Sequence, residues 1–225
     1  MNRPEGYRLL DVVAMGFVAM LLIANTIAVK VVQIGEFVLP AGIICFPVAY
    51  IFGDVLTEVY GYEKTRRIIW IGFACLGIMS LFYYIATILS PASFWEDQAA
   101  FERLFGFAPR IAAASFAAYL VGSFLNAFVM SRMKVWTGGR HLWMRTIGST
   151  IVGEGIDSVV FNVAAFAGVF QLHQVFYIAL SGFVLKTLYE IAATPVTYVL
   201  VGQLKRIEGV DQYDRGISYN PFRVG

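Results

Sequence analysis

The chain has 225 residues, of which 59% are hydrophobic and 14% are charged, and its formal net charge is +2 at pH 7. A soluble domain is about half apolar and about a quarter charged, so this composition excludes an ordinary soluble domain and indicates an integral membrane protein. The sequence lacks the strict alternation of polar and apolar residues that a membrane β-barrel requires.

Six long apolar runs follow one another along the chain, and they predict an all-α membrane protein with six transmembrane helices in a single membrane domain, 1–225. About 20 residues, at ~1.5 Å each, cross a ~30 Å hydrocarbon core. Pro40 and Pro47 interrupt the second run. The last run is long enough to require a tilt or a kink at Pro195. The first run has no small-residue cleavage site after it and is expected to be a retained helix. The predicted spans are 11–32, 38–60, 68–89, 111–130, 151–172 and 175–203.

The basic residues predict the orientation of these spans. Thirteen of the 17 Lys and Arg residues lie in segments that six spans would place on one side of the membrane, together with both termini. The opposite side receives only Arg103 and Arg110, while Lys30 and Lys186 lie inside spans or at their ends. The positive-inside rule then places both termini in the cytoplasm. The alternative use of the basic residues, binding of nucleic acid or acidic lipid, is minor, and no nucleic-acid partner is expected.

Two stretches, 51–59 and 151–159, read almost alike one hundred positions apart. Each belongs to the middle helix of a three-span half, so the second half would enter the membrane from the opposite side. This arrangement is an inverted-topology repeat, a common plan for transporters. Asn25 and Asn126, which are 101 positions apart, support the repeat, and coincidence is the alternative reading.

Five acidic residues lie within the predicted spans. A charged side chain at the centre of a membrane helix costs roughly 2.5–3.5 kcal/mol, so most of these groups must face one another, water or a ligand. They mark the expected substrate or ion pathway. They are Asp54, Glu58, Glu154, Asp157 and Glu190.

The spacing of these groups places them on single helix faces. Asp54 and Glu58 are one turn apart, and Glu154 and Asp157 share a face with Asn162. If the two faces meet, they form a small acidic cavity. The alternative is that the first pair lies at the cytoplasmic interface near Arg66 and Arg67, and that the second pair serves a helix start.

The last span carries two further charges, Lys186 and Glu190, one helical turn apart. They could neutralise each other as structural charges. The alternative is that one of them, like Glu58, acts in coupling or contacts a ligand. Deep tyrosines could stack on a planar ligand, and they are Tyr50, Tyr119 and Tyr189.

Small residues form the Ala112–Gly122 face of the fourth span. Small residues allow close approach of helices, so this face either packs within the monomer or receives a second copy or a coupling subunit. No catalytic set, metal-ligand spacing or phosphate loop emerges, and His141 and His173 fall in predicted loops. We therefore expect no enzyme activity, no cofactor and no metal.

The segment Gly53–Tyr62, followed by Arg66–Trp70, resembles the queuosine precursor transporter family, also called the vitamin uptake transporter family. The segments Arg110–Phe116 and Gly153–Ser158 strengthen the resemblance. It implies a six-span protein of the bacterial cytoplasmic (inner) membrane, similar to the substrate-binding components of energy-coupling-factor vitamin transporters. It also implies uptake of a 7-deazaguanine precursor of queuosine: 7-cyano-7-deazaguanine, 7-aminomethyl-7-deazaguanine or queuine.

Such a ligand matches the acidic faces chemically. A guanine-like edge offers two parallel donors, which Glu154 or Asp157 could accept in a bidentate arrangement. Asp54 or Glu58 could pair with an aminomethyl group or carry a coupling proton. The candidates for bonding the 6-oxo group are Asn25, Asn126 and Asn162. The alternative function is a vitamin-binding subunit that delivers ligand to an energy-coupling-factor ABC transporter.

Overall fold

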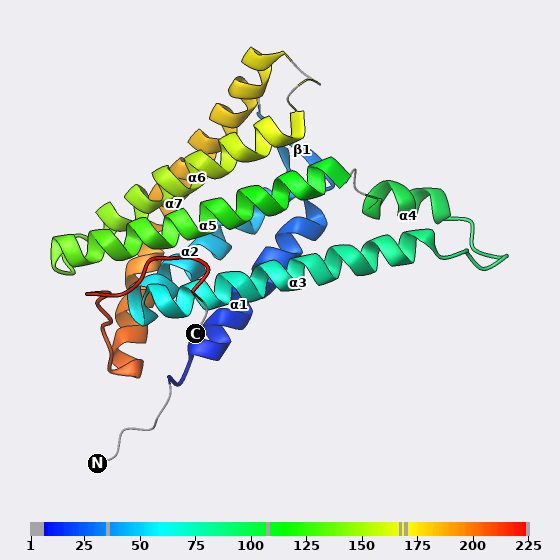
Figure 1. Ribbon diagram of the computed structural model, residues 1–225. Helices are drawn as coiled ribbons and strands as arrows, with labels where there is room; N and C mark the ends of the chain where they lie inside the picture. Colours follow the sequence, from blue (N-terminus) through cyan, green and yellow to red (C-terminus); the bar gives the residue numbers. More distant parts are fainter. Residues whose placement is uncertain (1–6, 35–36, 107–108, 167, 169–170, 224–225) are drawn as a thin grey trace.

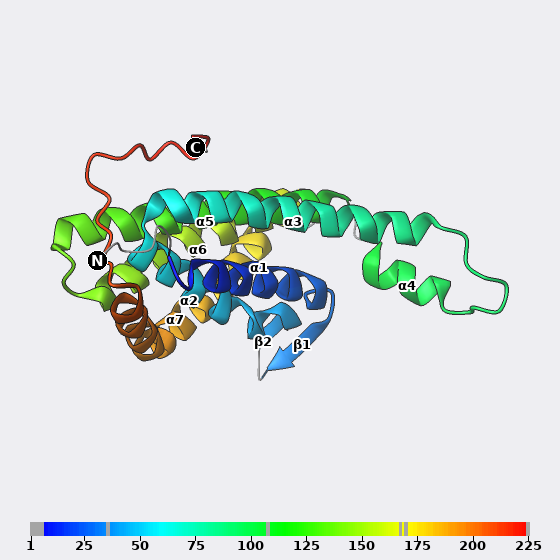
Figure 2. The same ribbon diagram turned by 90° about the horizontal axis from the view of Figure 1, so that it is seen from below.

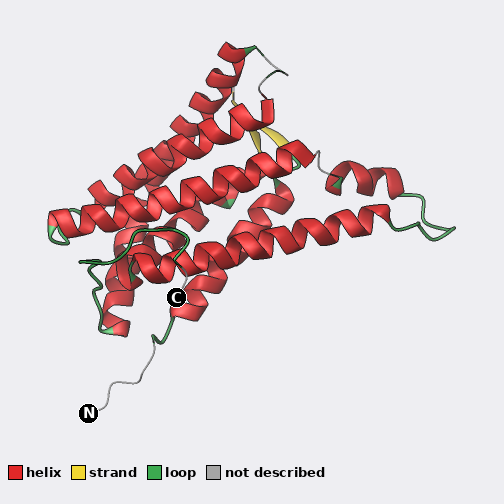
Figure 3. Ribbon diagram, in the orientation of Figure 1, coloured by secondary structure: helices red, strands yellow, loops and turns green. Residues whose placement is uncertain are grey.

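The computed structural model describes residues 7–34, 37–106, 109–166, 168 and 171–223. Helices dominate this part of the chain (Figure 3). The described elements, in chain order, are α1 (Leu10–Ile27), β1 (Val31–Ile34), β2 (Phe37–Pro40), a 3-10 helix η1 (Ala41–Ile44), α2 (Phe46–Val55), a π-helix η2 (Leu56–Tyr60), α3 (Tyr62–Ile88), α4 (Gln98–Phe105), α5 (Pro109–Thr137), α6 (Leu142–Phe166) and α7 (Leu172–Glu208).

The expected class, an all-α membrane protein, is confirmed. Among the described helices, four are long and apolar enough to cross a membrane: α1, α3, α7 and the Ala113–Thr137 part of α5. Large apolar side chains such as Phe82 and Leu188 stand exposed on these helices, as expected where the surroundings are lipid. The count of six spans stays a prediction.

The helices pack so that the expected cytoplasmic ends lie together. Figure 1 shows the starts of α1, α3 and α6 and the ends of α5 and α7 on one side of the molecule, and the opposite ends on the other side. The most extensive helix contact joins α5 and α6, and α2 packs against α1, α5 and α7. The short helix α2 is therefore an interior element.

The predicted span over 38–60, interrupted by Pro40 and Pro47, is not a single helical element. The segment begins as strand β2, which pairs antiparallel with β1 in the register Val31↔Pro40, and the helix α2 begins only at Phe46. Pro47 stands in the first turn of α2, where its missing N–H is not needed. The predicted first span, 11–32, also ends early, because α1 ends at Ile27. Figure 2 shows the hairpin projecting from the side of α1 that faces away from α3 and α5.

The predicted repeat halves consequently differ in their middle elements. The first uses α2 and the π-helix η2, fifteen residues from Phe46 to Tyr60, and the second uses the single 25-residue helix α6. All five residues of η2 are buried, and η2 ends at Gly61, which has φ +84°. π-helical turns are rare and frequently occur at functional sites.

Two glycines allow α5 and α6 to touch. A Cβ on Gly122 would lie 2.8 Å from the Cβ of Asp157, and a Cβ on Gly153 would lie 2.8 Å from the Cβ of Asn126. Gly122 of the Ala112–Gly122 face thus packs within the monomer. The side chain of Ala112 lies outside the described part of the chain.

Helix α7 continues through Pro195 as one helix from Leu172 to Glu208. Figure 1 shows that it changes direction, running behind α6 in its first part and past α2 in its last. Proline lacks the N–H that would bond the carbonyl of Ile191, and this loss bends helices. The kink expected at Pro195 is consistent with this course.

The segment 210–223, here called the C-terminal strap, folds back over the ends of α3 and α5. The Asp214 carboxylate accepts hydrogen bonds from the Tyr62 backbone N–H at 2.8 Å and from the Ser131 hydroxyl at 2.5 Å. Arg66 donates to two backbone carbonyls of the strap, at 2.9 and 2.8 Å, and Trp70 donates to a third. Arg66 therefore anchors the strap.

Candidate functional site

The two acidic stretches meet in the interior through a tyrosine. Tyr50 lies on α2, one turn before Asp54, and its hydroxyl donates a 2.6 Å hydrogen bond to Oε2 of Glu154 on α6. Asp54 is itself within electrostatic range of Glu154. The meeting of the two faces, on which the expected acidic cavity depends, is therefore present.

A lysine from α7 closes the second acidic face. Lys186 Nζ lies 3.0 Å from Oε2 of Glu154 and 2.9 Å from Oδ2 of Asp157. All three side chains are mostly buried. The expected neutralisation of Lys186 by Glu190 is wrong, because neither oxygen of Glu190 has a hydrogen-bond partner among the described residues.

Asn126 on α5 joins the two faces. Its side-chain amide donates to Oδ1 of Asp54 at 3.0 Å, while its Cβ packs against Gly153 of α6. Gly153 has no side chain, and this lets the Cβ of Asn126 lie directly against α6. The amide is thus positioned between the first and second acidic stretches.

Two carboxylates in this region are fully buried and incompletely bonded. Asp54 and Glu190 each have 0% exposure. Within the described part of the chain, Oδ2 of Asp54 and both oxygens of Glu190 lack hydrogen-bond partners. Asp54 lies on α2 and Glu190 on α7, and these two helices pack together. These oxygens are available to a ligand or a proton.

Glu58 belongs to a separate cluster at the end where α5, α6 and α7 converge. Arg145 Nη2 lies 2.8 Å and Lys205 Nζ 2.7 Å from Oε1 of Glu58, and Lys134 Nζ lies 3.4 Å from the same oxygen. The carboxylate is fully buried among three cations. The described ion-pair partners of Glu58 are thus Lys134, Arg145 and Lys205, and not Arg66 or Arg67.

Asp211 of the C-terminal strap completes this cluster. It pairs with Lys134 at 2.5 Å and with Lys205 at 2.8 Å. Burial would raise the pKa of Asp211, but the hydrogen bonds and charges of the two lysines outweigh burial and hold the pKa below its usual value. The cluster ties the strap to the transmembrane helices and has the character of a structural ion-pair network.

Two of the asparagines predicted to bind the substrate donate hydrogen bonds to backbone carbonyls of their own helices. Asn25 donates to the backbone carbonyl of Leu21 at 2.8 Å, and among the described contacts nothing joins it to the acidic residues. Asn162 donates to the backbone carbonyl of Ser158 at 2.8 Å. Its Oδ1 is buried and lacks a partner in the described part of the chain. Asn162 can therefore accept a bond from a ligand, whereas Asn25 stands apart.

The hydrogen bond of Tyr50 is the feature of the candidate site that the sequence does not predict. The sequence suggests stacking of its ring on a ligand, whereas in the structure its hydroxyl bonds Glu154. The available signal was its spacing, because Tyr50 precedes Asp54 by one helical turn and so shares its face.

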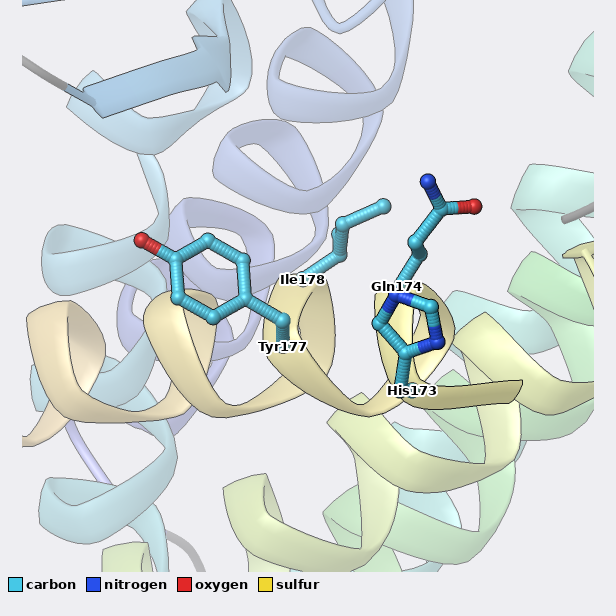
Figure 4. A pocket seen from close by; sticks show the side chains of 4 residues that line it. All are labelled: His173, Gln174, Tyr177 and Ile178. Carbon is cyan, nitrogen blue, oxygen red and sulfur yellow. The ribbon is translucent and has the colours of Figure 1, made fainter. Parts of the chain in front are cut away.

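A shallow surface hollow lies elsewhere, at the start of α7. His173, Gln174, Tyr177 and Ile178 line it (Figure 4). None of these residues is acidic, and Tyr177 is largely exposed. His173, predicted to lie in a loop, is in the first turn of α7. This hollow is not the candidate site, which consists of buried groups.

The chain is similar to known transport proteins. A family model described as "Putative vitamin uptake transporter" matches residues 40–200. The "Probable queuosine precursor transporter" of Bacillus subtilis (strain 168) is 30% identical over 176 residues, which cover 78% of this chain and 77% of that protein. No solved structure matches the chain.

Two further relatives match shorter segments. The "Queuosine precursor transporter" of Escherichia coli (strain K12) is 30% identical over 125 residues, covering 56% of this chain and 54% of that protein. The "Probable queuosine precursor transporter" of Haemophilus influenzae is 34% identical over 130 residues, covering 56% of this chain and 51% of that protein.

Proposed function

Because this chain belongs to the vitamin uptake transporter family, we propose that it is a membrane transporter that imports a 7-deazaguanine precursor of queuosine. The names of its relatives support this substrate class. The observation that carries the proposal is the buried meeting of α2, α6 and α7 around Glu154. Polar groups gathered inside a membrane protein mark a substrate or ion pathway.

The proposed binding residues are Glu154, Asp157, Asn162, Asn126 and Asp54. The ammonium of Lys186 contacts one oxygen of each carboxylate of α6. A guanine-like edge, with two parallel N–H donors, would take the place of this ammonium on Glu154 or Asp157. The unpartnered Oδ1 of Asn162 supports a role as acceptor for a ligand N–H. Asn25 has the weakest support, because its amide is bonded to its own helix.

The proposed topology is a single membrane domain that crosses the cytoplasmic (inner) membrane of a bacterium six times, with both termini in the cytoplasm. The four long apolar helices would be joined by α6 and by the unit of η1, α2 and η2. The gathering of the basic ends on one side of the molecule supports this arrangement (Figure 1). The contact between Tyr50 and Glu154 supports the opposition of two inverted halves.

The proposed partner surface is the outward part of the Ala112–Gly122 face. Ala113 and Ala117 are exposed, which leaves them free to approach a second copy or a coupling subunit. Uptake into liposomes that contain only this protein separates an independent transporter from a subunit of an energy-coupling complex. Uptake without any other protein is the expected result.

Ligand binding by the purified protein tests the proposed function. Titration calorimetry with 7-cyano-7-deazaguanine and 7-aminomethyl-7-deazaguanine should detect binding to the wild type. Glu154→Gln and Asp157→Asn should weaken it by about tenfold or more, because each removes a charge-assisted bond of about 1.5–3 kcal/mol. Glu96→Gln, a substitution at an exposed loop residue, is the matched control. Equal affinity in all variants would exclude the proposed site.

A further inference from the structure

Asp54, one of the proposed binding residues, and Glu190, to which no substrate contact is assigned, are two acidic side chains with unbonded oxygens. Asp54 lies on α2 and Glu190 on α7, and these helices pack together. Both side chains are fully buried, and three of their four carboxylate oxygens have no hydrogen-bond partner among the described residues. Among the described residues, the neutral amide of Asn126 is the donor to the fourth oxygen, Oδ1 of Asp54.

The cationic side chains described on the neighbouring helices form ion pairs with other carboxylates. Lys186 of α7 pairs with Glu154 and Asp157 of α6. On the other side, Glu58 of η2 is surrounded by the cationic residues Lys134, Arg145 and Lys205. The acidic residues Glu190, Glu58 and Glu154 all act electrostatically on Asp54. The charges around the pair therefore add repulsion to the cost of burial.

Two ionised carboxylates cannot persist in this environment. An ionised group buried without a partner is so costly that it takes up a proton. When two carboxylates share one site, mutual repulsion keeps one of them protonated, and the remaining carboxylate accepts its hydrogen bond. With both carboxylates buried in this way, at least one proton must be bound at Asp54 and Glu190.

We propose that Asp54 and Glu190 are the proton-binding pair of this transporter and that proton movement through the pair drives import. The inference rests on the proposed transport function. One proton enters from the outer side, neutralises one carboxylate and permits the closed state. The same proton leaves to the cytoplasm when the pair is hydrated again, so charge and protons balance over one cycle.

The backbone around Glu190 allows such a change. Pro195 leaves the carbonyl of Ile191, the next residue after Glu190, without its helical N–H partner. One residue earlier, the Thr194 hydroxyl donates to the carbonyl of Glu190 at 2.8 Å. A helix weakened at this point can change its bend, which would move Glu190 relative to Asp54.

Infrared spectroscopy of the purified protein tests the proton directly, without any substrate. At neutral pH the wild type should show a carboxylic-acid C=O band that shifts in D2O. Glu190→Gln and Asp54→Asn should each remove or shift this band, whereas Glu96→Gln, at an exposed site, should leave it unchanged. The two variants are alternatives in case one fails to fold. A wild-type band that is absent, or that neither substitution affects, would overturn the proposal.

Liposome uptake of radiolabelled 7-cyano-7-deazaguanine tests coupling. With one proton per neutral substrate, accumulation should rise by about tenfold per pH unit when the outside is acidic. Glu190→Gln should lose this dependence while retaining ligand binding by calorimetry. Uptake by the wild type that ignores the gradient would refute coupling. A wild type that binds neither deazapurine would refute the proposed function, and the infrared result would still decide the proton pair.

Discussion

The hydroxyl of Tyr50 donates a hydrogen bond of 2.6 Å to the carboxylate of Glu154, and the two residues are 104 positions apart in the sequence. This bond joins the first acidic helix to the second. Lys186 approaches the same carboxylate oxygen from α7. Helices α2, α6 and α7 are therefore joined at one carboxylate oxygen, Oε2 of Glu154, by two donors.

Tyr50→Phe should lower both thermal stability and ligand affinity. The substitution keeps the ring and removes the donor, and a hydrogen bond to a charged group contributes about 1.5–3 kcal/mol. Thermal unfolding of the detergent-purified protein and calorimetry measure the two effects. Tyr177→Phe, at an exposed position of α7, is the matched control. If the two variants behave alike, the Tyr50–Glu154 bond contributes nothing.

Lys186→Met should destabilise the protein by about 3–5 kcal/mol, because it leaves Glu154 and Asp157 buried without their cation. Adding Glu154→Gln and Asp157→Asn should restore most of the loss, since a neutral polar set no longer needs the ammonium. Comparison of unfolding free energies for the single, double and triple variants isolates this coupling. Strictly additive effects would contradict the described ion pairs.

Gly153→Ala should separate α5 from α6. The added methyl group would lie 2.8 Å from the Cβ of Asn126 and 2.9 Å from the carbonyl oxygen of Gly122. Overpacking of this kind costs about 1–3 kcal/mol. Gly182→Ala in α7, where a Cβ meets nothing within 4 Å, should instead be neutral or stabilising by about 0.5–1 kcal/mol. Thermal unfolding of the pair checks this difference, and equal melting temperatures would refute it.

Asp211 should make the attachment of the C-terminal strap dependent on pH. The folded protein lowers its pKa below the unfolded value, so its contribution is complete above about pH 4, the ordinary value, and disappears as the pH falls through the folded pKa. Because the side chain is partly exposed, the effect should be at most about 1 kcal/mol. Asp211→Asn should be less stable than the wild type at pH 7 and equally stable at the acidic limit. A pH-independent difference would contradict this account.

Class and family could be predicted from the residues alone. Long apolar runs have few solutions in a bilayer, where every backbone polar group must be bonded within the protein, and helices satisfy this requirement. The acidic faces were also predictable, because the helical repeat places Glu154 and Asp157 together. The secondary structure of residues 38–60 was not predictable, since Pro40 and Pro47 are compatible both with a kinked helix and with a strand followed by a new helix.

Which charged side chains form ion pairs with one another is decided by contacts between helices that are distant in the sequence. The spacing of Lys186 and Glu190 suggested a local pair, but the contact of α7 with α6 brought Lys186 to Glu154 and Asp157 instead. The same is true of Glu58, whose three cations come from α5, α6 and α7 rather than from the adjacent start of α3. Sequence proximity limits which pairs are possible, whereas the packing of distant helices decides which form.

The sequence by itself determined that this protein is a helical membrane protein of a transporter family and that its acidic residues lie on two helix faces. These properties follow from composition, periodicity and local motifs, which are independent of how the helices pack. Only the tertiary structure decided that the faces meet through Tyr50 and Asn126 and that, within the described part of the chain, Asp54 and Glu190 have no cationic partner. The physical reason is that a buried charge is stabilised by whichever groups the fold brings within a few ångströms, and those groups lie on other helices.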